Sequence, residues 1–446
     1  MLTRRRFLAS TLLAAAWGGM PGMARASMQT PWRNWSGWLL ANPKDRIAPE
    51  SEDELITFLK QSSGKLRPVG AGHSFTPLVP TEGHLLVLDR LSGIVSADAG
   101  TLRARIRAGM RLGDIGEPLE AKGQAMYNLP DIDRQTLAGA ISTSTHGTGL
   151  GLRSLSGYVT GLRLVTSGGD VMELSASSQP DIFNAARVSV GALGIITEVE
   201  MQNRAPFRLL SRTWIQNTEE VLESFDKLAA EWQHFELMPF LHADYSLVIA
   251  HKETSEPVRP ELPVEDDSEV LSLIDSTPVM LRGALINSLA TQIEPTESVL
   301  PSWNALTNVR LVRFNEMEYS VPAAEGPECL RRILDTVARA GAEATIPLEY
   351  RTIDGDDTWL GMCSGGPRVS ISVHRMAIHD YRPLFDLVEP IFWEHGGRPH
   401  WGKIHTLGRN ELRGLYPHFD DFNEVRTLLD PGERLLNPYL ARLFKD

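Results

Sequence analysis

Cysteine is almost absent from this 446-residue sequence, which contains only Cys329 and Cys363. Two cysteines provide no disulfide framework, and no Cys-x-x-Cys or other cysteine-rich metal-binding spacing is present. In an oxidising compartment the pair could form one disulfide, whereas two buried free thiols are an equally good reading. The sequence therefore excludes a disulfide-stabilised scaffold and leaves the state of the two thiols open.

Long apolar runs and an excess of positive charge are also missing. The longest apolar run, 8–20, is interrupted by glycine and is shorter than the roughly 18 to 20 residues that a membrane span needs. The formal net charge is -12, and the first 26 residues, with four arginines and no acid, make the remainder more acidic still. Binding to nucleic acid needs a basic surface. We therefore expect no nucleic-acid partner and no stable membrane insertion.

The amino terminus has the pattern of an export signal. The segment "TRRRFLAS" (3–10) places twin arginines before the short apolar run, and "ARA" (24–26) offers small residues for cleavage. We interpret residues 1–26 as a twin-arginine signal peptide of a periplasmic protein. Export by this route follows folding, so a cofactor could be loaded in the cytoplasm.

Neither of the two common nucleotide-binding motifs occurs in the sequence. "GAGHSF" (70–75) lacks the third glycine of a dinucleotide fingerprint, and no Gly-Lys-Ser/Thr follows a glycine-rich loop. Two further segments are rich in glycine: "TLAGAISTSTHGTGLG" (136–151) and "GALGIITEV" (191–199). Each could be a plain turn, but glycines also allow backbone N–H groups to converge on a diphosphate. Three such loops in one half of the chain favour a cofactor cradle.

The expected secondary structure mixes helices and strands in the α+β manner. In the amino-terminal half we expect a capped helix beginning after Ser51, a hairpin around "TSGGD" (166–170), and several short strands. The strands expected there are 85–88, 94–97, 102–108, 158–165 and 171–174. In the second half we expect helices at 219–231 and 326–340, strands at 245–250, 309–319 and 368–373, and a polar surface loop at 252–267.

Polar residues in the carboxyl-terminal half suggest a second site. Glu349 and Arg351 are two residues apart, so on a strand both side chains would project from one face. Together they could bind sugar hydroxyls, although a structural ion pair between the two side chains is the simpler interpretation. His374 or a lysine of lowered pKa, Lys403, could take a proton from a reacting hydroxyl.

Three histidines recur at intervals of five residues near the carboxyl terminus. His395, His400 and His405 could suggest a metal site, but this spacing places them on no common helix or strand face. No carboxylate or cysteine accompanies them in a familiar pattern. We therefore expect no metal.

The order of these motifs resembles the vanillyl-alcohol oxidase flavoprotein superfamily. The resemblance rests on "RPVGAGHSF" (67–75), the segment 106–133, and the two later glycine-rich loops. The endings "HWGK" (400–403) and "LLNPYLARLF" (435–444) are similar to its sugar-1,4-lactone oxidase and alditol oxidase branch, which includes gulonolactone and arabinonolactone oxidases. The match is weakest over 252–301.

That resemblance implies a two-subdomain FAD-binding domain with an α+β substrate domain, or cap. The implied divisions are residues 27–205 for FAD, 206–395 for the cap, and 396–446 for a segment that returns to the FAD domain. His73 matches a histidine that many members bond to the flavin, so FAD is expected to be covalent. The implied cofactor-binding residues are Gly70, Ala71, Gly72, His73, Ser74, Thr136, Gly139, Ser142, Thr145, His146, Gly147, Gly194, Ile195 and Ile196.

The resemblance also implies an activity: oxidation of a CH–OH group in a small polyol or sugar lactone, with oxygen or a redox partner as acceptor. The implied catalytic residues are Glu349, Arg351, His374, Lys403 and Thr136. Of these, Thr136 matches a small hydroxyl residue that would orient Lys403. The alternative is a periplasmic flavin-bound sugar-binding or sensory protein without turnover. The sequence leaves open the particular substrate and the oligomeric state.

Overall fold

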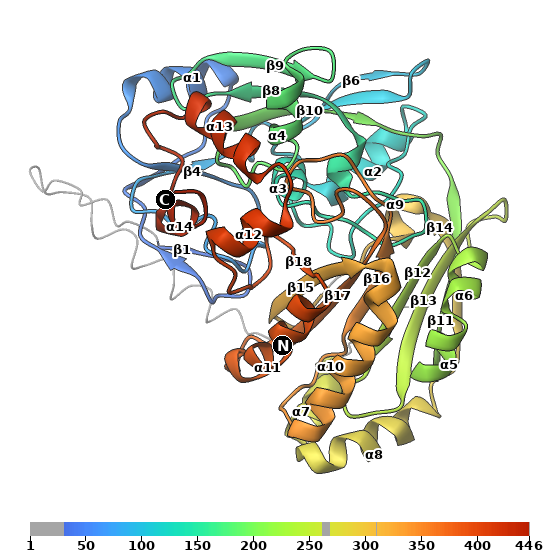
Figure 1. Ribbon diagram of the computed structural model, residues 1–446. Coiled ribbons are helices and arrows are strands. Elements are labelled where there is room, and N and C mark those ends of the chain that lie inside the picture. The colour runs from blue at the N-terminus through green and yellow to red at the C-terminus, as the bar shows by residue number, and fades with distance from the viewer. Residues whose placement is uncertain (1–30, 261–267, 309, 446) are drawn as a thin grey trace, which may run out of the picture. The chain divides into compact units, whose positions relative to one another are not determined.

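Strands and helices alternate along the chain, which confirms the predicted α+β class (Figure 1). The computed structural model describes residues 31–260, 268–308 and 310–445. The predicted signal peptide lies outside these residues. Within them the strands form sheets of three, five and eight strands, in addition to a two-stranded ribbon of β1 (Trp32–Arg33) and β2 (Leu40–Ala41).

The two smaller sheets come from the amino-terminal half. A parallel sheet has the order β3-β5-β4, and an antiparallel sheet has the order β6-β7-β10-β8-β9. The strands are β3 (Asp45–Ile47), β4 (Leu66–Val69), β5 (His84–Val87), β6 (Ile94–Asp98), β7 (Arg103–Arg107), β8 (Val159–Val165), β9 (Val171–Ser175) and β10 (Ile195–Gln202). The helices are α1 (Glu52–Gln61), α2 (Leu112–Glu120), α3 (Leu137–Ser142) and α4 (Pro180–Ala186).

Two local predictions in this half are confirmed. Ser51 caps α1 by accepting a hydrogen bond from the backbone N–H of Glu54 at 3.2 Å. The hairpin also forms, because β8 and β9 pair antiparallel and Gly169 adopts a φ of 89° in their connection.

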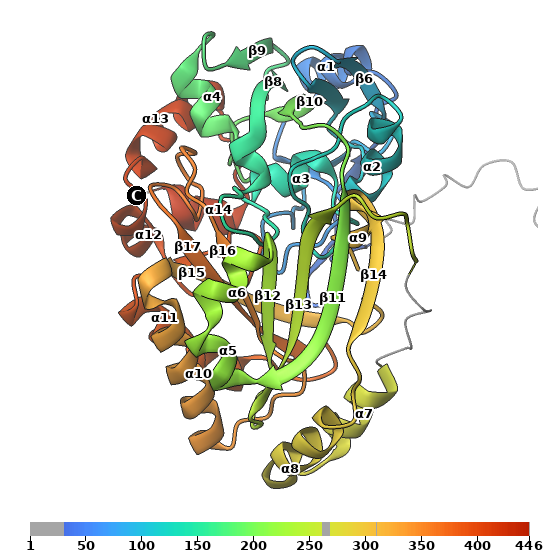
Figure 2. The ribbon, with the colours of Figure 1, turned by 90° about the vertical axis from the view of Figure 1, so that its right-hand side faces the viewer.

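The largest sheet is entirely antiparallel, with the order β14-β11-β13-β12-β16-β17-β15-β18. Its strands are β11 (Arg208–Asn217), β12 (His234–Pro239), β13 (Tyr245–Thr254), β14 (Thr296–Pro301), β15 (Phe314–Pro322), β16 (Glu349–Ile353), β17 (Arg368–Met376) and β18 (Arg398–Pro399). The predicted boundary at residue 205 falls between β10 and β11. Figure 2 shows this sheet below the two smaller ones.

Helices cover one face of the large sheet, and the other face is polar. Buried apolar residues of α10 (Gly326–Ala340) and α11 (Arg382–Glu394) pack on the helix-covered face, where Tyr319 stacks on Phe392. The remaining helices are α5 (Thr218–Glu223), α6 (Phe225–Glu231), α7 (Ser268–Ser276), α8 (Val279–Ala290), α9 (Ser302–Ala305), α12 (Arg409–Leu415), α13 (Phe419–Leu429) and α14 (Pro438–Phe444). No helix of the described residues is long and apolar enough to cross a bilayer.

Three predicted elements differ from the structure. The helix expected at 219–231 is two helices, α5 and α6, with Ser224 between them. The strand expected at 309–319 begins only at Phe314 and runs on to Pro322, opposite β17. Part of the loop expected at 252–267 continues β13 to Thr254, where pairing with β11 extends the strand.

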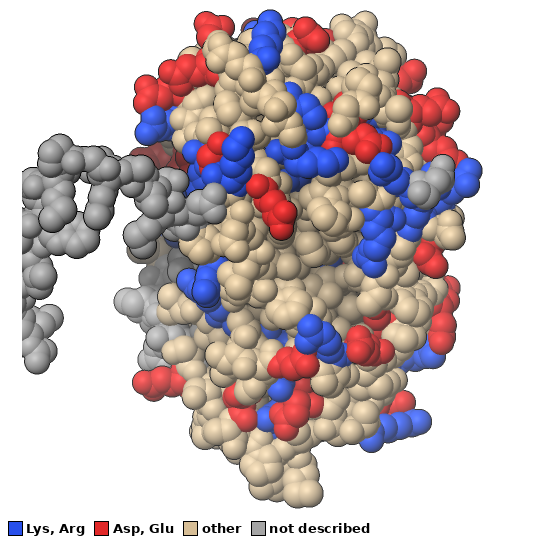
Figure 3. Space-filling model, turned by 90° about the vertical axis from the view of Figure 1, so that its left-hand side faces the viewer, with Lys and Arg blue, Asp and Glu red and all other residues tan. Residues whose placement is uncertain are grey.

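The carboxyl-terminal segment packs back on the amino-terminal half. Leu435 belongs to the same buried cluster as Leu55 and Leu66, and the Phe75 N–H donates to the Gly402 carbonyl at 2.6 Å. The first residues of the segment, however, form β18 at the edge of the large sheet. On the face in Figure 3, acidic and basic side chains are interspersed around tan areas.

Candidate active site

The first glycine loop follows β4 and lies directly against the start of α3. A Cβ atom on Gly70 would fall 2.2 Å from the Thr136 Oγ1 atom, so a side chain at this position would collide with α3. Thr136 caps α3 by accepting from the Gly139 N–H at 3.3 Å. The loops that the sequence places 60 residues apart therefore meet, and only glycine allows this approach.

A cavity lies between these loops, with an empty volume of about 1130 Å³ including its open mouth. Its walls carry many glycines, hydroxyls and backbone groups and few charged side chains, which suits a bulky cofactor with a diphosphate. The predicted residues that line it are Gly70, Ala71, Gly72, His73, Ser74, Thr136, Gly139, Ser142, Thr145, Gly194, Ile196 and Lys403. These residues fit FAD: the glycines clear space that Cβ atoms would fill, and the threonine and serine hydroxyls offer donors.

Three predicted cofactor residues do not line the cavity. Ile195 belongs to the buried cluster of Leu55, because adjacent residues of β10 point to opposite faces and Ile196 takes the cavity side. Gly147 lies against the Leu129 carbonyl. His146 is buried and bonded to the large sheet. These three residues lie outside the cavity wall, and their role in binding the cofactor stays a prediction.

His73 sits in the cavity wall and stacks on Trp35, with ring centroids 5.3 Å apart. Burial, followed by the nearby positive charge of Lys403, lowers the pKa of His73 to about 4. The imidazole is therefore neutral at pH 7, and one of its two ring nitrogens keeps a lone pair for bonding.

The polar face of the large sheet supplies the second set of side chains. Residues directly opposite on paired strands share a face, and the register pairs Glu236 with Arg351 and Glu316 with His374. Glu349 pairs with Ser372 on the same face. Four strands thus place their acids and bases on the side away from α10 and α11.

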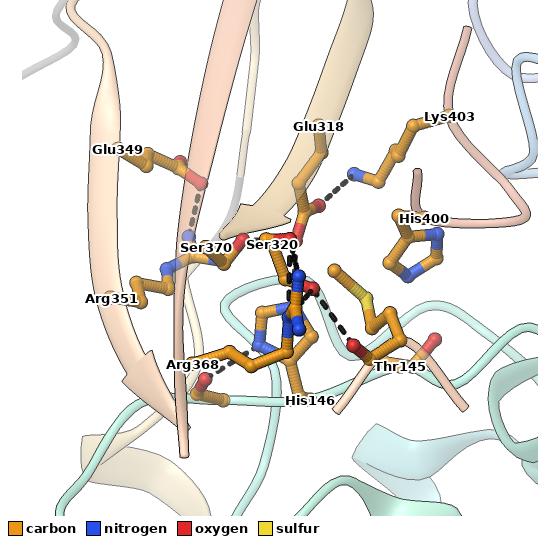
Figure 4. A network of polar contacts seen from close by, with 12 residues as sticks. Thr145, His146, Glu318, Ser320, Glu349, Arg351, Arg368, Ser370, His400 and Lys403 are labelled. Carbon is orange, nitrogen blue, oxygen red and sulfur yellow. Dashed lines mark hydrogen bonds and ion pairs between the residues drawn. The ribbon is translucent and has the colours of Figure 1, made fainter. Parts of the chain in front are cut away.

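Glu349 and Arg351 form a buried ion pair, as their spacing on one strand face predicts (Figure 4). A second carboxylate holds the same guanidinium, because Arg351 Nε lies 3.1 Å from Glu236 Oε1. Burial lowers the pKa of Arg351, but the surrounding carboxylates outweigh burial and raise it well above its usual value. Arg351 is a permanent cation clamped between two acids.

His374 is buried with its two ring nitrogens directed differently. Nδ1 lies 3.1 Å from the Pro347 carbonyl, which can only accept, so Nδ1 carries a proton. Nε2 lies 3.6 Å from Glu316 Oε1 and 4.0 Å from Glu349 Oε1. Burial lowers the pKa of His374, yet its contacts with the two carboxylates outweigh burial and raise it.

Lys403 extends from the carboxyl-terminal segment to the polar face of β15. It forms a direct ion pair with Glu316 Oε2, and its Nζ atom lies 3.7 Å from Glu318 Oε2. Burial lowers the pKa of Lys403, but the two carboxylates more than compensate and raise it. The predicted lysine of lowered pKa is therefore wrong: Lys403 is a paired ammonium rather than a base.

Thr136 also differs from its implied role. Its hydroxyl is used to cap α3 and to border Gly70, whereas the ion pairs of Lys403 within the described residues are with Glu316 and Glu318. The structure thus brings Glu349, Arg351 and His374 together on the sheet, places Lys403 between the sheet and the cavity, and puts Thr136 in the cavity wall.

Sequence reasoning missed five charged residues of the site. They are Asp131, Glu236, Arg310, Glu316 and Glu318; Arg310 lies 3.9 Å from Glu349 Oε1 and pairs with Asp131 at 2.8 Å. Glu316 and Glu318 alternate in "FNEMEYS" with apolar residues, a strand pattern that could have placed both on one face. Burial raises the pKa of Glu316, but the positive charge of Lys403 outweighs burial, and the pKa is lowered to about 2.

Glu236 behaves differently from the other acids. Burial raises its pKa to about 7, because the opposing charge of Arg351 is offset by Glu349 and Asp131. Its Oε1 atom is close to Arg351 but outside hydrogen-bonding geometry, so this buried oxygen has no hydrogen-bond partner. No feature of its own strand in the sequence marks Glu236 out from an ordinary surface acid.

The three spaced histidines have separate partners. His395 Nδ1 lies 2.9 Å from Glu325, His400 Nδ1 accepts from the Gly402 N–H at 3.0 Å, and His405 Nε2 lies 3.0 Å from the Tyr439 hydroxyl. A different group, Glu316, Glu349 and His374, has ligand atoms within 4.8 Å of one another. Lys403 and two arginines already neutralise its carboxylates.

The two cysteines are buried, free thiols in separate clusters. Burial raises the pKa of Cys329 to about 12, so this thiol is not a nucleophile.

Comparison with known proteins agrees with both halves of the site. The model of the D-arabinono-1,4-lactone oxidase family matches residues 199–443, and the model of an FAD binding domain matches residues 43–175. L-Gulono-1,4-lactone dehydrogenase of Mycobacterium tuberculosis is 34% identical over 428 residues, which cover 93% of this chain and 99% of that protein. Alditol oxidase of a Streptomyces species is 26% identical over 424 residues, which cover 93% and 99%.

A solved structure shares the fold. The crystal structure of cholesterol oxidase from B. sterolicum superposes with a TM-score of 0.78 at 15% sequence identity, covering 93% of this chain and 97% of that one. The cavity and the polar sheet face above it define an FAD-dependent oxidoreductase that acts on CH–OH groups of sugar lactones or alditols. The chain belongs to the D-arabinono-1,4-lactone oxidase family.

Proposed function

We propose that this chain oxidises a sugar-1,4-lactone at a CH–OH group, with FAD held in the glycine-lined cavity and covalently joined to His73. The observation that carries the proposal is the junction of the two halves: Glu316 and Lys403 line the cavity and also belong to the polar sheet face. A substrate bound there would meet the cofactor on one side and the acids and bases of the sheet on the other. Family membership supports turnover over the flavin-bound sugar-binding alternative.

The proposed segment roles follow the same division. Residues 27–205 would hold most of the cofactor, residues 206–395 would form the cap, and residues 396–446 would complete the cavity through Lys403. The contact of Gly402 with the first loop supports this, since it ties the returning segment to the cavity wall.

Glu349 and Arg351 would orient the substrate. The Glu349 carboxylate accepts hydrogen bonds from hydroxyl groups, and the Arg351 guanidinium donates to a ring or carbonyl oxygen. Because Glu236 also holds Arg351, the guanidinium keeps its orientation when Glu349 turns toward a hydroxyl. Such pre-orientation is worth a large part of the rate.

FAD supplies the chemistry of the step, because its ring accepts the hydride that leaves the CH–OH carbon. The hydroxyl proton must leave at the same time, and we assign it to His374 Nε2. Nδ1 already donates to Pro347, which leaves Nε2 as the accepting nitrogen of the neutral ring. Glu316 and Glu349 then stabilise the protonated ring, and the carbon–oxygen bond becomes a carbonyl.

Lys403 would supply charge rather than accept the proton. Its ammonium stands in the cavity wall, where it favours negative charge that builds up during the reduction. The neutral His73 imidazole would provide the nitrogen for the covalent bond, in a loop where glycines permit close approach.

The proposal is tested with a panel of aldono-1,4-lactones and alditols mixed anaerobically with purified protein. The expected result is loss of the 450 nm flavin band with at least one aldonolactone, and no bleaching by any compound would favour the binding protein. Under air, stoichiometric hydrogen peroxide would identify oxygen as the acceptor, whereas turnover only with an added dye or redox protein would identify a dehydrogenase.

Covalent attachment has its own test. Acid precipitation of the wild-type protein should give a yellow pellet, and His73→Ala should release the colour to the supernatant. A wild-type supernatant that carries all the flavin would refute the bond, and a yellow pellet from His73→Ala would place it on another residue.

We also propose export to the periplasm by the twin-arginine route. Replacing Arg4 and Arg5 by lysine should retain the protein in the cytoplasm, as cell fractionation would show. An unchanged distribution between compartments would contradict this proposal.

A further inference from the structure

His146 was expected in the cofactor cavity, but it is directed at the large sheet instead. The loop after α3 carries it, and its Nε2 atom lies 2.6 Å from Glu318 Oε1 of β15 (Figure 4). Its side chain is only 2% exposed, as is that of Glu318. The predicted chemistry leaves this buried pair without a role.

The contacts of His146 fix its protons. Nδ1 lies 2.8 Å from the Gly147 carbonyl and Nε2 faces the Glu318 carboxylate, so both ring nitrogens face acceptors. Because a carboxylate only accepts, Nε2 donates to Glu318. Burial raises the pKa of Glu318, but His146 and the other cations outweigh burial and hold it well below the usual value. The pair is thus a buried histidine ring bound to a carboxylate.

The Glu318 carboxylate is held by donors from two different segments. Its Oε1 atom also accepts from the Ser370 hydroxyl on β17, so donors from two segments fix the carboxylate. Its Oε2 atom stands 3.7 Å from Lys403 Nζ. Glu316, the direct partner of Lys403, faces His374 with its other oxygen and takes part in the proposed proton transfer.

We propose that His146 and Glu318 are positioning residues. They hold the Lys403 ammonium in the cavity wall while Glu316 changes its contact with His374 during the proposed proton transfer. The inference rests on the proposed function, because it concerns the charge that Lys403 supplies there. It also joins the loop after α3, one wall of the cofactor cavity, to the polar face of the cap.

Several other groups act on Lys403 and set the background for a test. Glu349 on β16 attracts the ammonium, while His374 on β17, His73 in the first loop and His400 in its own segment adjoin it. Burial lowers the pKa of both His73 and His400 to about 4, so these two rings are neutral at pH 7. Glu316 and Glu318 are therefore the charges whose loss matters most.

The test combines Glu318→Gln, His146→Leu and His146→Gln in the FAD-loaded protein. The first readout is the acetylation of Lys403 by acetic anhydride as a function of pH, measured by peptide mass spectrometry. Loss of an opposite charge at this distance should move the acetylation midpoint of Glu318→Gln down by about one pH unit. His146→Leu leaves the Glu318 charge in place and removes a donor that competes for it, so it should raise the midpoint, and His146→Gln, which keeps an amide donor near the Nε2 position, should restore it.

The second readout separates substrate binding from flavin reduction in stopped-flow experiments. Glu318→Gln and His146→Leu should slow reduction by about 10- to 100-fold, with a smaller change in substrate dissociation constant. Glu389→Gln is the matched control: this buried carboxylate also accepts several hydrogen bonds, from Tyr319 and Thr406. It should leave the Lys403 midpoint and the reduction rate unchanged.

An unchanged Lys403 midpoint in Glu318→Gln, with normal FAD content, would overturn the inference. If that variant fails to fold, Glu318→Asp, which keeps the charge but withdraws it from Lys403 by one methylene group, should lower the midpoint by less than one unit; no shift would again overturn the inference. Failure of the proposed function is a different result, because the wild-type flavin would then not be reduced by any lactone while the Lys403 shifts persisted.

Discussion

The cofactor cavity and the polar face of the large sheet are built in contrasting ways. The cavity is made by loops whose glycines and hydroxyls are neighbours in sequence, and its walls carry few charged side chains. The sheet face is made by single residues from four strands, and it gathers Glu236, Glu316, Glu318, Glu349 and Arg351 in buried positions. A large cofactor is therefore bound mainly by backbone groups and an open cavity, whereas proton transfer requires acids and bases whose charges nearly balance.

A substitution on the charged sheet face should have the largest effect on the rate of flavin reduction. Glu349→Gln removes the substrate-binding carboxylate and one partner of both Arg351 and His374. Flavin reduction by the lactone should slow by about 100- to 1000-fold, the usual range for a group that acts on the reacting atoms. Stopped-flow absorbance at 450 nm measures this rate. A tenfold or smaller loss, with FAD content intact, would contradict a direct role for Glu349.

A substitution in the glycine-lined cavity should first lower the FAD content of the protein. Gly70→Ala forces a Cβ atom toward Thr136 Oγ1, and the α3 cap must be disturbed to admit it. Loss of the cap costs about 1 kcal/mol, and narrowing of the cavity adds to the loss of FAD. The ratio of absorbance at 450 nm to that at 280 nm should fall in the purified variant.

Gly414→Ala is the control for this substitution, because a Cβ atom at Gly414 meets nothing within 4 Å. This variant should keep the wild-type absorbance ratio. Full FAD content in Gly70→Ala would show that the approach of the first loop to α3 does not shape the cofactor site.

The sequence predicted the cavity better than the sheet face, for a physical reason. Glycine spacing is a local signal, so the loops at Gly70, Thr136 and Gly194 were found and do line one cavity. Even there, His146 lies outside the cavity wall, and a motif does not tell which residues turn away from the space that it encloses. His146 instead bonds to a strand more than 150 residues later in the chain.

The sheet face depends on register, which the sequence does not reveal. Glu349 and Arg351 were found from their period-two spacing on one strand. Glu236 and Glu316 reach them only because β12 pairs with β16 and β15 pairs with β17. The direction of the Lys403 pKa was wrong for the same reason, since its carboxylate partners were not known.

The smallest effect that we predict concerns Glu236 and the pH dependence of protein stability. The pKa of Glu236 is raised to about 7 in the fold, so between pH 4.5 and 7 the folded state binds this proton and the unfolded state releases it. The contribution of Glu236 to stability is therefore lost as pH rises through that window. The glutamine of Glu236→Gln does not titrate. As pH rises through this window, the free energy of unfolding of the variant should therefore increase relative to that of wild type, by up to about 1.4 kcal/mol per pH unit.

Urea unfolding of both proteins at pH 5 and pH 8 measures this change. The difference in free energy of unfolding between Glu236→Gln and wild type should be more favourable to the variant at pH 8. An equal difference at the two pH values would show that Glu236 is ionised throughout and that Arg351 balances it fully.

The central claim, that the charged sheet face and the glycine-lined cavity form one oxidase site, is tested most directly by anaerobic titration of wild-type protein with aldono-1,4-lactones. We predict that at least one lactone bleaches the 450 nm band completely and that Glu349→Gln, with the same flavin content, reacts far more slowly. A flavin that dithionite bleaches but no lactone or alditol reduces would contradict it.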